Sequence, residues 1–253
     1  MRKYSQLDIA PTIAKVLKLD LPRSDGCPIE EVINWGCKNA ILIIVDSLGY
    51  DLYRWLEPDL KVMRGIASKG FLFRAATVSN STTPAIASIL SGLIPEHHCI
   101  YDKAGASTSS IVSLPEIASV SGFRSAVIME RNGAEVYKGL IEIVGGVSDS
   151  LDPKEFDSEI NRLSLEAISQ RPRLLVSYYI GIDKTAHLGL GPKEIKEAAV
   201  FIDNCIGELV RAAPEETMVI ICGDHTVHAG ALKRTRKPYC VALIVGSIGR
   251  RDS

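Results

Sequence analysis

Short aliphatic runs recur along the chain, and they limit its fold more than any other feature. The first, Ala40 to Val45, is apolar without a break, which is typical of a parallel strand buried on both faces of a sheet. Further strands are predicted at 71–78, 124–129, 140–144, 174–180, 218–222 and 239–245. Segments with helical signals separate them, at 8–18, 59–69, 84–91, 114–121, 152–167 and 192–213. This alternation predicts an α/β fold, a three-layer αβα sandwich with a mostly parallel central sheet.

Composition fits one folded domain over residues 1–253, with small insertions at about 99–113 and 130–150. The chain is 46% hydrophobic, so we expect a sizeable core. Its net charge of −1 favours neither nucleic acid nor a membrane as a partner. No apolar stretch reaches the roughly 18–20 residues that span a bilayer. The N-terminus also lacks the apolar run of a signal peptide. We therefore expect a cytoplasmic protein.

A cluster of hydroxyl residues stands between the predicted strand 71–78 and the helix that Pro84 opens and Gly92 ends. One of these hydroxyls is expected at a helix N-terminus, where free N–H groups and the helix dipole favour an anion such as phosphate. The residues are Ser79, Ser81, Thr82 and Thr83. From this stretch alone, a helix cap and a nucleophile both stay open.

Other reactive side chains follow the remaining strands, at the edge of a parallel sheet where ligands bind. They are Asp46, Arg131 with Asn132, Asp183 with His187, and Asp224 with His225 and His228. Each has a plain alternative, such as a turn-capping Asp, a solvated helix pair or an exposed loop. Together, three carboxylates with nearby imidazoles predict a site for zinc or manganese. A hydroxyl beside such a site is a candidate nucleophile.

Four sequence blocks follow one another in order: Ile43–Gly49, Ser81–His98, Ile182–His187 and Cys222–His225. In this order and spacing they resemble the alkaline phosphatase superfamily. The phosphodiesterase, nucleotide pyrophosphatase and cofactor-independent phosphoglycerate mutase branches are the most similar. The resemblance implies two divalent metal ions, with zinc favoured over manganese. It also places the nucleophile two residues before the proline, at Thr82, and a Thr there argues against a sulfatase.

The same resemblance implies how the ligands divide between the metals. One ion would be held by Asp46, Thr82, Asp224 and His225. The other would be held by Asp183, His187 and a further His, for which His228 is the nearest candidate in the sequence. Relatives carry that last His at the position of Arg234, so Arg234 is an alternative partner for phosphate. Thr83, Arg131 and Asn132 complete the expected substrate contacts.

We therefore expect a metal-dependent hydrolase that acts on small phosphate esters (phosphodiesters, nucleotide pyrophosphates or phosphomonoesters) through a phospho-threonine intermediate. The alternative is a non-catalytic relative that binds metal or a phosphorylated ligand. One further expectation concerns the order of the chain. The segment Ser5 to Gly26 resembles a block that relatives carry after their last strand, which suggests a circular permutation.

Overall fold

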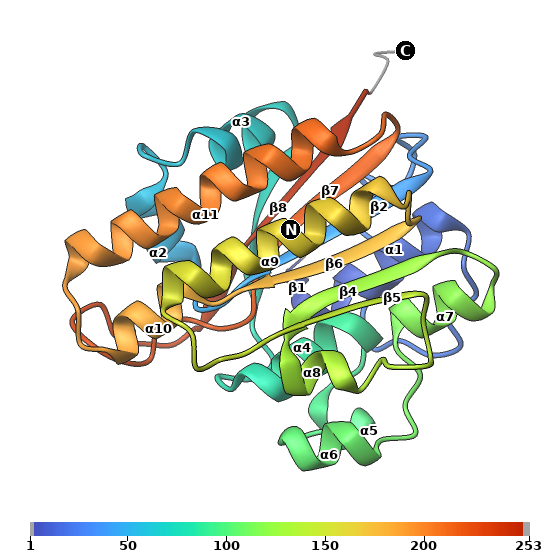
Figure 1. Ribbon diagram of the computed structural model, residues 1–253, viewed down its shortest axis with the longest axis horizontal. Coiled ribbons are helices and arrows are strands. Elements are labelled where there is room, and N and C mark those ends of the chain that lie inside the picture. Colours follow the sequence, from blue (N-terminus) through green and yellow to red (C-terminus); the bar gives the residue numbers. More distant parts are fainter. Residues whose placement is uncertain (1–2, 250–253) are drawn as a thin grey trace.

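The computed structural model describes residues 3–249, and a single eight-stranded sheet runs through them (Figure 1). The strand order is β1-β3-β8-β7-β2-β6-β4-β5. The strands are β1 (Tyr4–Ser5), β2 (Asn39–Val45), β3 (Phe71–Ala76), β4 (Ser125–Glu130), β5 (Ile143–Val147), β6 (Leu174–Tyr179), β7 (Thr217–Gly223) and β8 (Cys240–Ile248). Only β8 runs against its neighbours, β3 and β7, among these strands. The α/β prediction with a mostly parallel sheet is confirmed.

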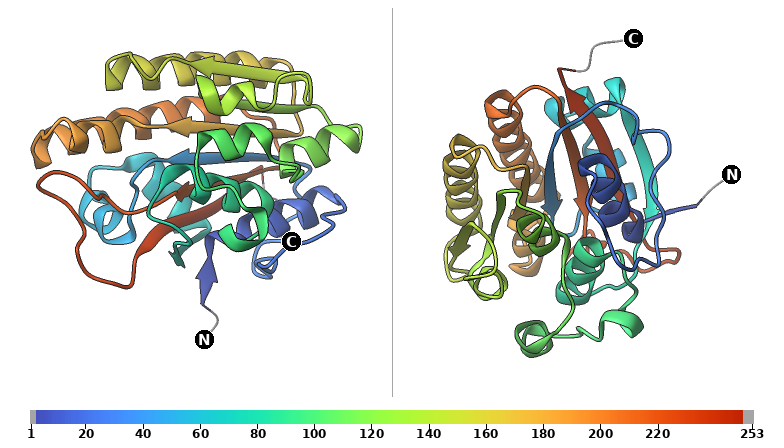
Figure 2. Two further views of the ribbon diagram at one scale, coloured as in Figure 1. Left: turned by 90° about the horizontal axis from the view of Figure 1, so that it is seen from below. Right: turned by 90° about the vertical axis from the view of Figure 1, so that its right-hand side faces the viewer.

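Helices cover both faces of the sheet, as the two views of Figure 2 show. The long helices α9 (Pro153–Ser169) and α11 (Pro192–Ala212) pack side by side on one face, and α11 also contacts α3 (Lys61–Lys69). On the other face, α1 (Ile9–Leu17) contacts β2 and α4 (Thr82–Ser91). The remaining helices are η1 (Gln6–Asp8), α2 (Tyr50–Leu56), α5 (Pro95–His98), α6 (Lys103–Thr108), α7 (Leu114–Val120), α8 (Arg131–Glu135) and α10 (Gly181–His187).

Two buried aspartates tie the helical layer together by capping helices other than their own. Asp203 of α11 accepts the N–H groups of Val62 and Met63 at the start of α3, at 2.9 and 2.8 Å. Asp157 of α9 accepts those of Ile180 and Gly181 at the start of α10, at 2.9 and 3.1 Å. Because a helix N-terminus has unpaired N–H groups, each carboxylate fixes the position of the helix that it caps.

The structure differs from the sequence prediction at several element boundaries. α4 begins at Thr82 rather than Pro84, which places Thr82 inside its first turn. The stretch 101–113, expected as a loop, contains α6, whose start Asp102 caps through the N–H of Gly105. The strand expected at 140–144 is β5, at Ile143–Val147. Leu140 lies before it and is half exposed, because a turn precedes the strand.

The N-terminal segment lies beside the centre of the molecule. β1 pairs with β3 at the sheet edge, and Gln6 behind it is fully buried. The Gln6 side-chain amide donates to the carbonyl oxygens of Gly223 and Asp224 and accepts the N–H of Val78 at 3.1 Å. This segment therefore joins the loop after β7 to the loop after β3. The circular permutation stays a hypothesis.

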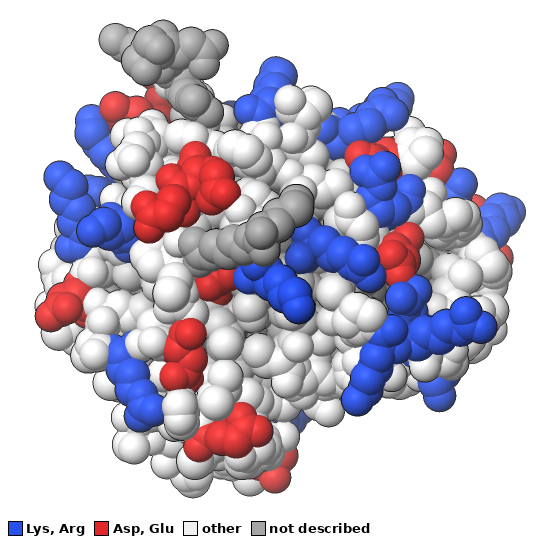
Figure 3. All heavy atoms as spheres, turned by 180° about the vertical axis from the view of Figure 1, so that it is seen from behind, with Lys and Arg blue, Asp and Glu red and all other residues white. Residues whose placement is uncertain are grey.

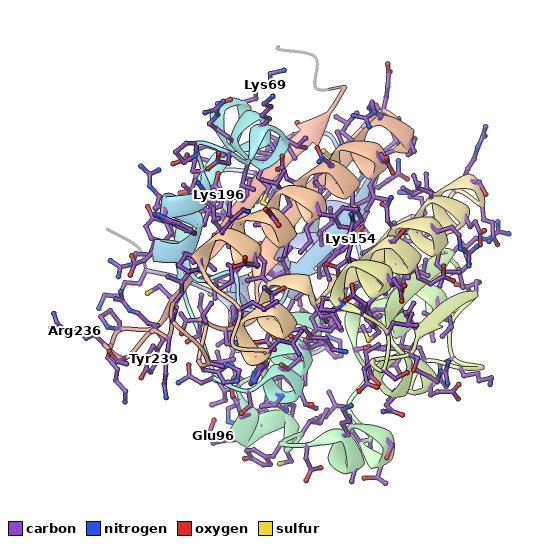
Figure 4. All side chains as sticks on the ribbon, turned by 60° about the vertical axis from the view of Figure 1, so that its left-hand side comes forward. Lys69, Glu96, Lys154, Lys196, Arg236 and Tyr239 are labelled. Atoms are coloured by element: carbon purple, nitrogen blue, oxygen red, sulfur yellow. The ribbon has the colours of Figure 1, made fainter. Side chains whose placement is uncertain are left out.

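Charged side chains of both signs share the face shown in Figure 3, and Lys and Arg gather toward one lower edge of it. The loop after His228 carries Lys233, Arg234, Arg236 and Lys237, of which Arg234 alone is partly buried. Figure 4 shows Arg236 pointing away from the body of the molecule. Within residues 3–249, none of the helices is long and apolar enough to cross a membrane.

Candidate metal centre

Four elements deliver the candidate ligands to one edge of the sheet. Asp46 directly follows β2, and Asp224 directly follows β7, two strands that pair in parallel. Asp183 lies in the first turn of α10, just beyond β6, which flanks β2 on its other side. Thr82 opens α4 after β3. Because β3 also runs parallel to β7, all these side chains come from carboxyl ends of strands, as the sequence predicted.

The first cluster centres on the Nε2 atom of His225. The hydroxyl oxygen of Thr82 lies 3.1 Å from it, Asp46 Oδ1 lies 3.2 Å away, and Asp224 Oδ2 lies 3.4 Å away. Four ligands at about 2.0 Å from a tetrahedral zinc ion would lie about 3.3 Å from one another. The three spacings around His225 Nε2 are therefore compatible with a small tetrahedral cation.

The hydrogen bonds of the two carboxylates support the same interpretation. Asp46 Oδ2 accepts the hydroxyl of Tyr178, and Asp224 Oδ1 accepts the N–H groups of Ser47 and His225. The opposite oxygens, Asp46 Oδ1 and Asp224 Oδ2, are buried without a hydrogen-bond partner. Since buried polar atoms are almost always paired, two unpaired carboxylate oxygens facing one imidazole nitrogen fit a missing cation.

The tautomer of His225 agrees with this arrangement. Its Nδ1 lies 3.1 Å from the carbonyl oxygen of Thr226, which can only accept a hydrogen bond. The proton of the neutral ring is therefore assigned to Nδ1, and the lone pair of Nε2 faces Thr82, Asp46 and Asp224. A histidine oriented through its other nitrogen in this way is the usual form of a metal ligand.

The second cluster contains Asp183, His187 and His228. The Nε2 atoms of the two histidines lie 3.0 Å apart. Asp183 Oδ2 lies 3.5 Å from His187 Nε2, and Asp183 Oδ1 lies 3.9 Å from His228 Nδ1. Asp183, His225 and His228 also offer ligand atoms within 4.8 Å of one another. His228 is thus within reach of Asp183, where the sequence left the third ligand open.

Ser47 connects the two clusters. Its hydroxyl donates to Asp183 Oδ1 at 2.7 Å and lies 3.3 Å from His225 Nδ1. Its backbone has a positive φ of 64°, a conformation that glycine adopts more readily than serine. The side chain is fully buried, so this hydroxyl serves the ligands rather than solvent.

Electrostatics in the first cluster favour a bound cation. Burial, together with the charges of Asp224 and Asp183, raises the pKa of Asp46 well above its usual value. Burial and the same carboxylates raise the pKa of Tyr178, so its hydroxyl stays protonated and donates to Asp46. Three carboxylates this close repel one another, and a divalent ion would remove that repulsion.

The helix α4 presents its N-terminus to the same edge. Pro84 has no N–H group, and the N–H of Ala85 is used by the carbonyl oxygen of Ser81 at 3.2 Å. The N–H groups of Thr82 and Thr83 are therefore the ones that face outward from this end. Because they lie at the positive end of the helix dipole, they suit an anion beside the Thr82 hydroxyl.

A cavity of about 480 Å³ opens from the first cluster. Asp46, Thr82, Thr83 and Asp183 form its polar end, and the rest of the lining includes side chains of α4 and of the two segments expected as insertions. Asn132 lies on this wall. Arg131 is exposed on α8 and is not among the lining residues. Both residues were expected at the site from the sequence, and in the structure Asn132 lines the cavity whereas Arg131 does not.

Arg234 lies apart from the cavity. Its guanidinium pairs with Asp51 and donates to the carbonyl oxygen of Arg236, and it lines a second pocket of about 350 Å³ beside Trp55. None of the candidate metal ligands lines that pocket. Arg234 therefore does not occupy the place of the missing histidine in this structure.

Sequence reasoning missed four residues that act on the site. Ser47 and Tyr178 contact the ligands, Gln6 holds the loop of Asp224, and Lys103 lines the cavity. A polar residue directly after a strand was a usable signal for Ser47. Gln6 had no such signal, because its partners lie 217 and 218 positions away.

Two family models match parts of the chain. The type I phosphodiesterase / nucleotide pyrophosphatase model matches residues 115–237, and the sulfatase model matches residues 38–157. A search of curated protein sequences finds no significant match.

Solved structures share the fold at low sequence identity. Phosphonoacetate hydrolase from Sinorhizobium meliloti, in complex with phosphonoformate, superposes with a TM-score of 0.61 at 13% identity, covering 74% of this chain and 56% of that one. A protein in the alkaline phosphatase superfamily from Vibrio parahaemolyticus has a TM-score of 0.61 at 12% sequence identity, and the match covers 98% of this chain and 70% of that one. Lipoteichoic acid synthase LtaP from Listeria monocytogenes has a TM-score of 0.58 at 13% sequence identity, and the match covers 96% of this chain and 72% of that one. The chain thus spans little more than half of the hydrolase.

The family models, the shared fold and the clustered Asp and His side chains all agree with the four sequence blocks. The chain therefore has the fold of the alkaline phosphatase superfamily, and over parts of its length it matches the type I phosphodiesterase / nucleotide pyrophosphatase and sulfatase family models.

Proposed function

We propose that the chain hydrolyses phosphate esters, with Thr82 as nucleophile and two divalent metal ions as cofactors. The observation that carries the proposal is the pair of unpaired, buried oxygens of Asp46 and Asp224, which face His225 Nε2 beside the Thr82 hydroxyl. Asp46, Thr82, Asp224 and His225 would hold one ion. A second set, Asp183, His187 and His228, would hold the other.

When bound, these ions would supply positive charge that lowers the pKa of the Thr82 hydroxyl and offsets the charge of the phosphoryl oxygens. Thr82 Oγ1 then attacks phosphorus, the bond from phosphorus to the leaving alcohol breaks, and that alcohol takes up a proton. Water next attacks the phospho-threonine, which releases phosphate and restores the Thr82 hydroxyl. The N–H groups of Thr82 and Thr83 face the phosphoryl oxygens throughout, and Asn132 is a further contact at the cavity wall.

The proposal favours phosphate over sulfate esters, although a sulfatase model also matches. Sulfatases need a formylglycine made from a Cys or Ser at the nucleophile position, and this chain has Thr82 there. Zinc is the preferred ion, since the 3.1–3.4 Å spacings around His225 suit tetrahedral coordination. A cytoplasmic location is part of the same proposal and rests on the sequence.

The test combines metal content with turnover. Purified protein should contain two zinc or manganese ions per chain, and chelation should abolish hydrolysis of p-nitrophenyl phosphate or bis-p-nitrophenyl phosphate. Thr82→Ala should lower kcat by about a thousandfold or more. Thr82→Ser keeps the hydroxyl and serves as the matched control, so it should retain most of the activity. Metal bound at full occupancy without turnover of either ester would instead identify a binding protein.

A further inference from the structure

The cavity beside Thr82 has an aliphatic far end, which we call the leaving-group chamber. The side chains of Ile86 and Leu90 line it on α4, and Val136 and Leu140 line it from α8 and the turn that follows. Ile100 and Ile111 add apolar surface from the segments on either side of α6. α6 contacts both α4 and α8, and the three helices lie near one another in Figure 1.

One face of α4 lines the chamber and runs from Thr82 toward Leu90. Thr82, Ile86 and Leu90 are spaced four residues apart, so they lie on one face of the helix. At 1.5 Å per residue, Leu90 lies about 12 Å from Thr82 along the helix axis. A group that leaves phosphorus at Thr82 would therefore extend along an aliphatic row.

The charged residues around the chamber are two lysines, Lys103 and Lys184, and three carboxylates, Glu116, Glu130 and Asp149. Lys103 lies 3.5 Å from Glu130 and 3.9 Å from Asp149, while Lys184 donates to the carbonyl oxygen of Asp149. Glu116 accepts the N–H and the hydroxyl of Ser113. The described residues that line the chamber include no arginine. The three carboxylates Glu116, Glu130 and Asp149 outnumber the two lysines, which disfavours an anionic leaving group such as a nucleoside phosphate.

The chamber also offers little for stacking a base. Its aromatic lining residues are Tyr137 and Tyr178, with 7% and 4% of their surface exposed. Tyr137 packs into the core through its ring, and the hydroxyl of Tyr178 is used by Asp46.

Resting on the proposed function, we infer that the substrate is a phosphate ester of an uncharged aliphatic alcohol, whose chain lies along α4 from Thr82 toward Leu90. Burial of each added methylene contributes favourable free energy, so affinity should rise with chain length until the chamber is full.

Two measurements test this inference, and the second of them does not depend on turnover. The first compares ethyl, butyl and octyl phosphate by phosphate release from the metal-loaded enzyme, with adenosine monophosphate as the nucleotide. We expect kcat/KM to rise about tenfold or more from ethyl to octyl phosphate. The second measures binding of ethylphosphonate and octylphosphonate to metal-loaded Thr82→Ala by calorimetry, which needs no reaction.

Val136→Asp places a charge in the chamber wall, and it should lower kcat/KM and affinity for the octyl compounds more than for the ethyl compounds, which removes the preference for the longer chain. Val120→Asp is the matched control, because Val120 is 86% exposed on α7 and does not line the chamber. Leu140→Ser, at a half-exposed position, gives a milder second variant. Equal values for ethyl and octyl compounds, or a preference for the nucleotide, would overturn the inference. Failure of every ester, with octylphosphonate still preferred, would overturn only the proposed hydrolysis.

Discussion

Ser47 contacts both candidate ligand clusters, and its backbone conformation is unfavourable for a residue with a side chain. Its positive φ of 64° disfavours a residue with a Cβ by about 1 kcal/mol, while its hydroxyl orients Asp183 and His225. A glycine would relieve the backbone and leave both ligands without that partner. The serine is therefore explained by the ligands and not by the stability of the loop.

Ser47→Gly should weaken zinc binding by about 10- to 100-fold, as expected when a group that orients metal ligands is lost. The metal-free variant should melt at the same temperature as the parent or higher. Ser47→Ala loses the hydroxyl but keeps the unfavourable φ, so it should weaken zinc binding equally and lower the melting temperature. Competition with a chromogenic chelator measures the affinity. Unchanged zinc affinity in Ser47→Gly would remove Ser47 from the site.

Site residues that closely follow a strand can be predicted from the sequence more easily than residues that contact the site from a neighbouring strand. Asp46, Asp183 and Asp224 could be found because each comes within a few positions of a strand end. Tyr178 lies inside β6, where an aromatic residue is ordinary core. Its contact with Asp46 depends on β2 and β6 being neighbours, which no local pattern states.

Among the elements, α10 depends on a carboxylate from another helix. Asp157 of α9 accepts the N–H groups at the start of α10, whose first turn carries Asp183. Gly181 is required at this contact, because a Cβ there would lie 2.2 Å from the Asp157 carboxylate. The position of Asp183, a candidate metal ligand, is therefore set by two helices.

Burial raises the pKa of Asp157 to about 7 in the folded protein, against 3.8 for the ordinary side chain. The folded state thus holds the proton more tightly, and the free energy of unfolding should fall as pH rises from about 4 to about 7. The upper limit of the change is about 4 kcal/mol. Asp157→Asn cannot ionise, so the difference in stability between the parent and Asp157→Asn should change across this range. Urea unfolding of both metal-free proteins at several pH values checks it, and parallel profiles would contradict the assignment.

The boundaries of some helices could not be predicted from the local sequence. Pro84 was expected to open α4, yet the helix starts two residues earlier. Proline is compatible with any position of the first turn, so it could not mark which residue came first. α6 was missed because its sequence, Lys103 to Thr108, is small and polar, with no apolar periodicity to detect. Gly92 was expected to end α4 and does so with a φ of 73°.

On the scale of the whole molecule, the N-terminal segment connects two loops of the candidate site through the side chain of Gln6. Gln6 uses its side-chain oxygen and nitrogen to link Val78 with Gly223 and Asp224. These loops belong to strands separated by β8. One buried amide therefore sets the distance between the loop that leads to Thr82 and the loop that carries Asp224.

Gln6→Leu should leave the N–H of Val78 and two carbonyl oxygens without partners. We expect a loss of about 1–3 kcal/mol in the free energy of unfolding, and a lower kcat because Thr82 and Asp224 are no longer held together. Gln6→Glu tests the donors alone, since it keeps the acceptor for Val78 and loses the NH₂ group. Chemical denaturation and phosphate release measure the two effects. If both variants match the parent in stability and kcat, Gln6 has no positioning role.

The late position of β8 in the sequence has a consequence for protein synthesis. β8 is the strand that joins β3 to β7, but it is translated after both. Until residues 240–248 leave the ribosome, β3 and β7 both present open edges, which are prone to aggregation. Thr82 belongs with β3, whereas Asp46, Asp183 and Asp224 follow strands on the other side. We therefore expect a nascent chain to gather the candidate metal ligands that follow β2, β6 and β7 early, and to bring Thr82 beside them only when the last strand is inserted.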